Sequence, residues 1–374
     1  MNKKILHSLS VVALGLMLVA CDGGTGTTSK SPSDKNTYTL KVGSYVDLDS
    51  ELKVEVASAA VILNDQNKIV SAYFDVLQAP FAIDPTTKAL SINAAATQTK
   101  DAGAKVIETK KELGDRYGMK TGNSAYGSSS LEWWEQTAKF EKYCLNKTIE
   151  DVTSKNYKNS YNQSGTEVVD GCTISQGNFV NALKNITDTK QFKVEANKVS
   201  AGVGTIINAL SDKNVLTVTL AGSATDGTKV FETSINAYQI PLKATTATKD
   251  GATVDALGLN LDKKADDANA YQYVQVDPAN LGTNPITDVA SKRELKEKYG
   301  MTGIGEKGEW YVQADNFAKY AVKAANAKEL AGQNYKTHYN SNGTVEVEGC
   351  TITMTEFAAA VAESTTLKSD LKAR

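Results

Sequence analysis

Apolar and polar residues alternate along two separate stretches of the chain. The first is "LKVEVASAAVILNDQNKIVSAYFDV" at residues 52–76, and the second is "VLTVTLAGSATDGTKVFETSINAY" at residues 215–238. Alternation with a period of two is typical of strands with one buried face, and the internal segments "NDQNK" and "TDGTK" are rich in turn residues. Each stretch therefore predicts a β-hairpin.

A helical pattern follows each predicted hairpin. The charged segments "KKELGDRYGM" and "KRELKEKYGM" contain a glycine that favours a helix stop, Gly118 in the first and Gly300 in the second. The segments "WWEQTAKFEKYC" and "WYVQADNFAKYA" then predict a helix with one buried stripe. The stripe consists of Trp133, Thr137, Phe140 and Cys144, matched by Trp310, Ala314, Phe317 and Ala321. All 3 tryptophans stand at the start of these helices, which indicates core contacts or, alternatively, an aromatic platform for a ring ligand.

The tripeptide Gly-Cys-Thr occurs twice, at Gly171–Thr173 and at Gly349–Thr351, each time before an apolar helical pattern. Ser175 and Thr353 are natural N-caps of these helices, and Thr353 with Glu356 fits a capping box. Each threonine is therefore expected just ahead of a helix N-terminus, where unpaired N–H groups favour a phosphate. A plain strand–turn–helix junction would have the same caps and is the alternative interpretation.

These matched segments follow one order along the chain, which identifies an internal repeat. Copy 1 covers residues 39–190 and copy 2 covers residues 197–368, with an insertion around "TTATKDGATVDALGLNLDKKA" in copy 2. A length of 374 residues suits two domains. The order of strands before helices predicts an α+β fold, in which each copy is a mainly antiparallel sheet with helices packed on it.

The first residues resemble an export signal. A positive start, "MNKK", precedes the apolar run "ILHSLSVVALGLMLVA", which is short for a membrane span. The following "LVAC" matches a bacterial lipobox, so residues 1–20 are predicted to be a signal peptide and Cys21 the acylated residue. Residues 21–38 are polar and predict a flexible tether. The body is expected at the extracytoplasmic face of the cell membrane, anchored through membrane lipid, unless the signal is non-lipidated and Cys21 incidental.

Charge and histidine content exclude several classes of function. A net charge of −2 argues against a nucleic-acid partner, which needs a concentrated basic face. The sequence has 2 histidines, and His7 belongs to the signal, so His338 alone is left for the mature chain. A histidine-dependent catalytic site in each copy is therefore excluded, and clusters of zinc ligands are missing. Carboxylate pairs stay open, but no pattern singles one out, so no catalytic residue and no metal site is predicted.

The remaining cysteines allow two interpretations. Cys172 and Cys350 occupy equivalent places, whereas Cys144 has an alanine, Ala321, as its counterpart. A Cys144–Cys172 disulfide is conceivable outside the cytoplasm. Small buried thiols are the favoured alternative, because copy 2 has no partner for Cys350.

The order of these segments resembles the FMN-binding domain of the C subunit of sodium-pumping NADH:quinone reductase. It is especially similar to tandem lipoproteins of flavin-based extracellular electron transfer. In that family a flavin transferase joins FMN through its phosphate to the threonine of a Ser/Thr-Gly-Ala-Thr motif. The resemblance implies FMN at Thr173 and Thr351, bound covalently or noncovalently. The implied site residues are Gly171, Cys172, Thr173 and Ser175, with Gly349, Cys350, Thr351 and Thr353 in copy 2. Asp170 and Glu348 stand where the motif has serine or threonine.

Two functions follow from the resemblance. The first is an electron carrier that takes electrons from a membrane quinone or flavoprotein donor and passes them to an extracellular acceptor, with its cofactor as the redox group. The second is a flavin-free binding or adhesion lipoprotein on the same scaffold. Whether the protein is an enzyme is left open, with an electron carrier favoured over a hydrolytic or transferase enzyme.

Overall fold

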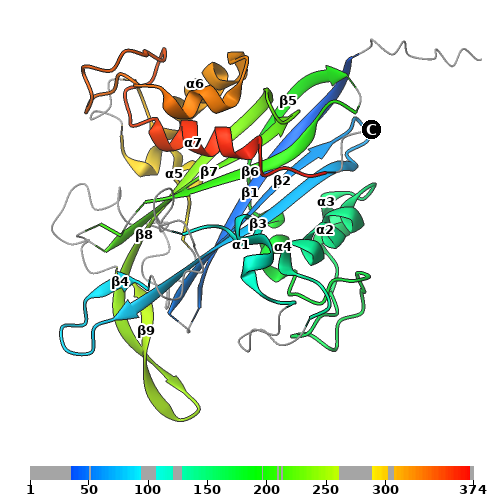
Figure 1. The fold of residues 1–374 in the computed structure, drawn as a ribbon, viewed down its shortest axis with the longest axis vertical. Helices are drawn as coiled ribbons and strands as arrows, with labels where there is room; N and C mark the ends of the chain where they lie inside the picture. Colours follow the sequence, from blue (N-terminus) through cyan, green and yellow to red (C-terminus); the bar gives the residue numbers. More distant parts are fainter. Residues whose placement is uncertain are drawn as a thin grey trace, which may run out of the picture. The chain divides into compact units, whose positions relative to one another are not determined.

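The computed structural model describes residues 35–49, 52–93, 107–120, 129–195, 197–208, 210–211, 214–260, 289–301 and 307–370, which fall within one compact unit, Lys35–Arg374. Two antiparallel sheets with helices packed against them form an α+β fold, which confirms the predicted class (Figure 1). The predicted signal peptide, Cys21 and the tether up to residue 34 lie outside the described residues.

The first sheet has the strand order β4-β3-β2-β1-β5. Its strands are β1 Lys35–Asp49, β2 Lys53–Leu63, β3 Ile69–Ile83, β4 Leu90–Ile92 and β5 Ile186–Glu195. The predicted hairpin is confirmed, because residues 64–68 connect β2 to β3 and Asn64 N donates to Lys68 O at 3.0 Å. The last residues of the predicted tether, 35–38, belong to β1 instead. Burial of Tyr38 explains this difference, since its ring stacks on Phe192 of β5 with centroids 5.9 Å apart.

The second sheet has the strand order β6-β7-β8-β9. Its strands are β6 Ser200–Ile207, β7 Val215–Thr225, β8 Val230–Lys249 and β9 Ala252–Leu259. The second predicted hairpin is also confirmed, with Asp226 N donating to Lys229 O at 3.2 Å across the turn between β7 and β8. The described part of the insertion lengthens β8 and adds β9 as its antiparallel partner. It therefore extends the sheet at one edge.

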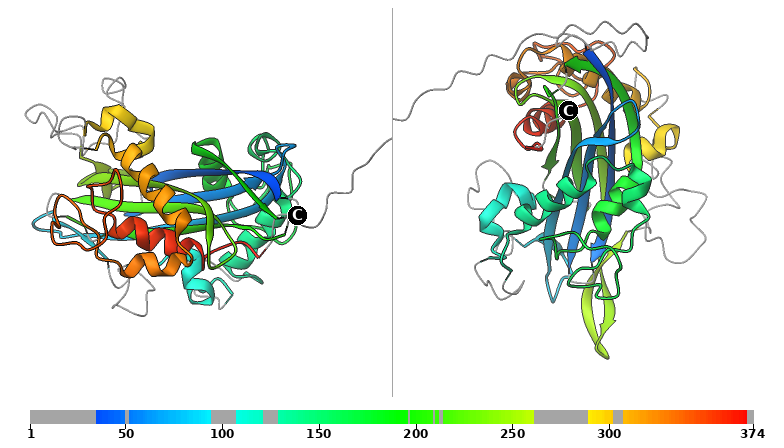
Figure 2. Two further views of the ribbon diagram at one scale, coloured as in Figure 1. Left: turned by 90° about the horizontal axis from the view of Figure 1, so that it is seen from above. Right: turned by 90° about the vertical axis from the view of Figure 1, so that its right-hand side faces the viewer.

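Each sheet carries its own group of helices, drawn cyan to green for copy 1 and yellow to red for copy 2 (Figure 2). Copy 1 has α1 Lys110–Leu113, the 3-10 turn η2 Gly114–Tyr117, α2 Trp133–Cys144, α3 Ile149–Thr153 and α4 Gly177–Lys184. Copy 2 has α5 Lys292–Leu295, η6 Lys296–Tyr299, α6 Trp310–Lys323, η7 Ala327–Gly332 and α7 Thr355–Ser364. The predicted stops are confirmed, because Gly118 and Gly300 follow the 3-10 turns with a left-handed φ of 81°.

The predicted buried stripe is confirmed on α2 and on α6. All eight stripe residues are buried, and they form the centre of the core beneath each helix group. Trp134 differs from the prediction for tryptophans, because 39% of its surface is exposed while its Nε1 donates to Asp115 at 2.9 Å. Trp134 directly follows Trp133 on the helix, so its side chain points away from the buried stripe.

A further core lies between the two sheets and draws on both copies. Val54 and Leu77 of the first sheet share one apolar cluster with Leu216 and Tyr238 of the second. The hydroxyls of Tyr238 and Ser44 also form a hydrogen bond of 2.7 Å between the sheets. Strand β3 contacts β6, and β5 contacts β8. The two copies therefore bury a common apolar face inside one compact unit.

Candidate functional site

The two Gly-Cys-Thr segments lie directly before α4 and α7, but the predicted caps are wrong by one residue. Gln176 and Met354 hold the N-cap positions, in place of Ser175 and Thr353. Both residues are buried, and Gln176 Nε2 donates to Cys172 Sγ at 3.2 Å. Burial of these side chains fixes where each helix starts. Ser175 Oγ still accepts a hydrogen bond from Gly177 N at 3.3 Å.

The predicted capping box of Thr353 with Glu356 does not form. Met354 rather than Thr353 caps α7, and no side-chain capping bond is made. Glu356 Oε1 instead accepts a hydrogen bond from Asn208 Nδ2 at 3.4 Å. The carboxylate is therefore directed toward the end of β6.

A buried glutamine holds the threonine of each segment. Gln136 Oε1 accepts hydrogen bonds from Thr173 N at 2.7 Å, from Thr173 Oγ1 at 3.0 Å and from Ile174 N at 3.2 Å. One side-chain carbonyl therefore satisfies the N–H groups of Thr173 and Ile174, two residues of the loop before α4. The other end of the amide is also fixed, since Gln136 Nε2 donates to Ser129 Oγ at 3.0 Å and to Leu131 O at 3.2 Å.

Copy 2 repeats this arrangement with Gln313. Its Oε1 accepts from Thr351 N at 2.8 Å, from Thr351 Oγ1 at 3.3 Å and from Ile352 N at 3.2 Å. Its Nε2 donates to Gly308 O at 2.9 Å. We call each set, Gln136 with Thr173 and Ile174 or Gln313 with Thr351 and Ile352, a glutamine clamp. The same clamp in both copies holds one threonine hydroxyl in one orientation.

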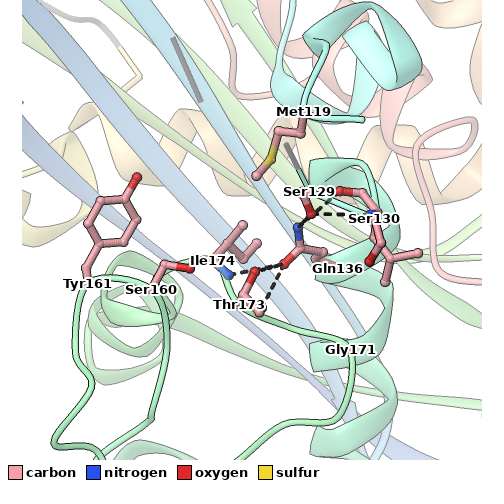
Figure 3. A pocket seen from close by; sticks show the side chains of 10 residues that line it. Met119, Ser129, Ser130, Gln136, Ser160, Tyr161, Gly171, Thr173 and Ile174 are labelled. Carbon is pink, nitrogen blue, oxygen red and sulfur yellow. Dashed lines mark hydrogen bonds between the residues drawn. The ribbon is translucent and has the colours of Figure 1, made fainter. Parts of the chain in front are cut away.

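A cleft of about 400 Å³ opens beside the clamp of copy 1 (Figure 3). Its walls are Met119, Ser129, Ser130, Leu131, Gln136, Ser160, Tyr161, Gly171, Thr173 and Ile174. Thr173 and Gly171 are exposed at this surface. The volume falls in the range of small-molecule sites, and hydroxyl groups line the cleft together with apolar side chains. The cleft is therefore suited to a ligand with both apolar and polar edges.

Both Gly-Cys-Thr segments favour glycine at their first position, but the surroundings of the two glycines differ. Gly171 has a φ of +71° and Gly349 a φ of +73°, a left-handed conformation that glycine adopts without strain. A Cβ at Gly171 would meet Lys139 Cε at 3.4 Å, an ordinary contact, whereas a Cβ at Gly349 would overlap Asn316 Nδ2. Asn316 Nδ2 donates to Gly349 O at 3.2 Å. Copy 1 thus has an ammonium group where copy 2 has a neutral amide.

Lys139 is the cation that stands beside Gly171. Its side chain is exposed, and it makes no ion pair with the described residues. The other nearby ammonium, that of Lys120, pairs with Glu135 at 2.8 Å. Lys139 therefore brings a positive charge close to Gly171, two residues before Thr173.

The cysteines of the segments are core side chains. Cys144, Cys172 and Cys350 are buried and free, so the Cys144–Cys172 disulfide is not formed and the interpretation as buried thiols is confirmed. Burial raises the pKa of Cys172 to about 11 and that of Cys350 to about 12, so both thiols are neutral near pH 7. Cys350 Sγ donates to Gln313 O at 2.9 Å, which ties it to the clamp helix.

Sequence reasoning missed both clamp glutamines and the contribution of Ser160 and Tyr161 to the cleft wall. Gln136 and Gln313 occupy the same place in "WWEQ" and "WYVQ", and this match was the available signal. Their role depends on a contact between distant segments, which helical spacing does not reveal.

Among the described residues, no group of His, Cys, Asp and Glu is arranged to hold a metal ion. Within the same residues, no helix combines the length and the apolar character needed to cross a membrane.

The comparisons with known proteins give one partial match. The chlorophenol reductase of Desulfitobacterium hafniense is 37% identical to this chain over 106 residues, which cover 26% of this chain and 29% of that protein. The chain therefore spans less than a third of the length of this relative. No protein-family model matches the chain, and no solved structure matches it.

Proposed function

We propose that this protein is a lipid-anchored carrier of FMN that relays electrons at the outer face of the cell membrane. The observation that carries the proposal is the exposed Thr173, held by a glutamine clamp at the wall of a ligand-sized cleft. Copy 2 repeats the clamp at the half-buried Thr351. The reductase name of the partial relative supports a redox role. Acylation of Cys21 would hold the body to membrane lipid.

The residues present fit FMN in three respects. The cleft volume of about 400 Å³ accommodates a ligand of this size, and Lys139 offers a charge for the phosphate. Thr173 Oγ1 donates its hydrogen to Gln136 Oε1, so the oxygen lone pairs point away from the glutamine. The hydroxyl is thereby presented as an acceptor or as the site of a phosphate ester.

An ester at the threonine would remove one of the three hydrogen bonds of the glutamine clamp. An ester removes the hydroxyl hydrogen, but Thr173 N and Ile174 N still donate to Gln136 Oε1. The loop would therefore keep its conformation after a flavin transferase acts on it. FMN would supply one- and two-electron transfer, and the protein would supply position, charge and anchoring. The electron donor is a membrane quinone or flavoprotein, and the acceptor is extracellular.

The test is the absorbance spectrum of the mature chain, expressed beside a flavin transferase and measured before and after denaturation and desalting. Wild type is expected to be yellow, and covalent flavin stays with the denatured chain. Thr173→Ala and Thr351→Ala should each remove one flavin, and the double variant should remove both. Thr166→Ala changes an exposed threonine of copy 1 that does not line the cleft and should keep both.

A colourless wild type that takes up no added FMN would overturn the proposal and favour the flavin-free binding lipoprotein. Yellow native protein that loses its flavin on denaturation would retain the carrier function and establish noncovalent binding.

A further inference from the structure

Two tyrosines at equivalent positions stand out from the surface of the two copies. Tyr161 and Tyr339 are each 84% exposed, more than any other large hydrophobic side chain that the structure describes. Each precedes an asparagine in the matched segments "NYKNSYNQSG" and "NYKTHYNSNG". An exposed aromatic ring does not gain the favourable free energy of burial. Here the ring is exposed at the equivalent position of both copies.

A rigid loop holds each ring in this position. Asn162 Nδ2 donates to Tyr157 O at 2.9 Å, and the equivalent Asn340 Nδ2 donates to Tyr335 O at 2.9 Å. In copy 1, Tyr161 N also donates to Asn159 Oδ1 at 2.9 Å. Side-chain hydrogen bonds of this kind fix the backbone of a loop. The rings are therefore placed outward by an ordered backbone.

The same loop is bonded to the segment that carries the threonine. Ser160 N donates to Thr173 O at 2.9 Å, and His338 N donates to Thr351 O at 2.7 Å. The residue directly before each tyrosine is thus hydrogen-bonded to the threonine of the clamp. In copy 1, Tyr161 and Thr173 line the same cleft, and Figure 3 shows Tyr161 beside Ser160, apart from Gln136 and Ser129.

The two tryptophans of the buried stripes do not offer such a ring. Trp133 and Trp310 are buried, where they pack edge-on against Phe179 and Phe357. The suggested aromatic platform at these two residues is therefore not available to a ligand.

We propose that Tyr161 and Tyr339 are positioning residues that stack on the planar ring system of the ligand bound at Thr173 and Thr351. This inference rests on the proposed function, in which that ring is the isoalloxazine of FMN. A phenol ring is electron-rich, an oxidised flavin ring is electron-poor, and offset stacking of the two is favourable. The clamp fixes the phosphate end of the ligand, and the tyrosine loop fixes its ring end.

The experiment uses the mature chain, expressed without a flavin transferase and titrated with FMN. Flavin fluorescence reports binding, and its intensity per bound flavin reports contact with an electron-rich ring. Tyr161→Leu is expected to raise the Kd of copy 1 roughly two- to tenfold and to increase the fluorescence of the bound flavin. Tyr161→Phe should retain most of the affinity, because a phenyl ring still stacks on the flavin. It should also increase the fluorescence of the bound flavin, because the electron-rich phenol is lost. Tyr339→Leu and Tyr339→Phe repeat the comparison in copy 2.

Val168→Ala is the matched control, since Val168 is an exposed apolar residue of copy 1 that does not line the cleft. It should change neither readout. If wild type binds FMN and Tyr161→Leu and Tyr339→Leu bind it with unchanged Kd and fluorescence, the tyrosine proposal is overturned and the carrier function stands. If wild type binds no FMN and is also colourless when expressed beside a flavin transferase, both proposals fall. If it is yellow there, the carrier function stands, and the fluorescence of the covalent flavin in the same variants decides the tyrosine proposal.

Discussion

The side-chain oxygen of Gln136 lies 2.7 Å from the backbone nitrogen of Thr173, although the two residues belong to separate segments of copy 1, a helix and a loop. The contact joins the tryptophan helix α2 to the loop before α4. Gln313 and Thr351 repeat it at 2.8 Å. The geometry of each candidate site thus depends on one buried amide group.

Replacing this amide should destabilise the protein. In Gln136→Ala, the N–H groups of Thr173 and Ile174 lose their acceptor, and a lost partner of this kind costs about 1–3 kcal/mol. The free energy of unfolding, measured by denaturant titration, should fall by that amount. Gln163→Ala removes an exposed glutamine of copy 1 and should leave stability within about 0.5 kcal/mol. Equal stabilities of the two variants would contradict the importance of the clamp.

The two motif glycines should respond unequally to alanine. Gly171→Ala strains a left-handed φ and is expected to lose about 1–2 kcal/mol of stability. Gly349→Ala carries the same strain and also overlaps Asn316, so its loss should be greater. Adding Asn316→Ala should restore part of the difference. The melting temperatures of the three variants measure these losses of stability. A Gly171→Ala protein that melts at a lower temperature than Gly349→Ala would contradict the expected overlap with Asn316.

A buried lysine in copy 2 should make stability rise with pH. Burial lowers the pKa of Lys292 from 10.5 to about 7, although nearby Glu356 acts in the opposite direction. Between about pH 7 and 10 the unfolded chain holds a proton that the folded chain has lost, so raising the pH favours the folded state, by at most about 1.4 kcal/mol per pH unit. Lys292→Met should flatten this rise in melting temperature. Lys323→Met, at an exposed lysine of α6, should preserve it.

A buried aspartate in copy 1 should make stability fall as the pH rises within the acidic range. Burial raises the pKa of Asp75 from 3.8 to about 6, against the favourable effects of Lys111 and of the hydrogen bond from Thr109. The folded state therefore holds a proton that the unfolded state has lost between about pH 4 and 6, and this contribution to stability decreases as the pH rises through that window.

Asp75→Asn should remove that decrease, and copy 2 has an asparagine at the equivalent place. Asn236 Oδ1 accepts from Ala237 N at 2.9 Å, just as Asp75 Oδ1 accepts from Val76 N at 2.8 Å. Denaturant titrations at pH 4.5 and 6.5 measure the change. Asp65→Asn, at an exposed turn residue, serves as the control. A pH profile of Asp75→Asn identical to that of wild type would rule out this role.

The sequence predicted the hairpins, the buried stripes and the glycine stops because each depends on local spacing. Trp133 and Phe140 are buried, as expected for apolar residues that recur on one face of a helix. The helix caps were displaced because Gln176 and Met354 are fixed by burial, which outweighs the preference of serine and threonine for the cap position. FMN, the lipid anchor and the electron-transfer partners stay predictions.

The site was only partly accessible from the sequence. The threonines were recognised because they stand in repeated segments before helices. The partners of Thr173 were not, because Gln136 reaches it from a helix far along the chain. The exposure of Tyr161 could not be predicted either, because the sequence of a polar loop does not indicate whether an aromatic side chain in it is buried or exposed.

The apolar face shared by the two sheets also bears on how such a chain arose. Leu216 and Tyr238 are covered by residues of copy 1, and an isolated half would leave them in water. A single-copy ancestor with this face would have needed a second molecule of itself, bound through the same surface on both subunits. Gene duplication would then have fused an existing symmetric dimer, after which the two halves could change separately, as the residues beside Gly171 and Gly349, Lys139 and Asn316, now differ.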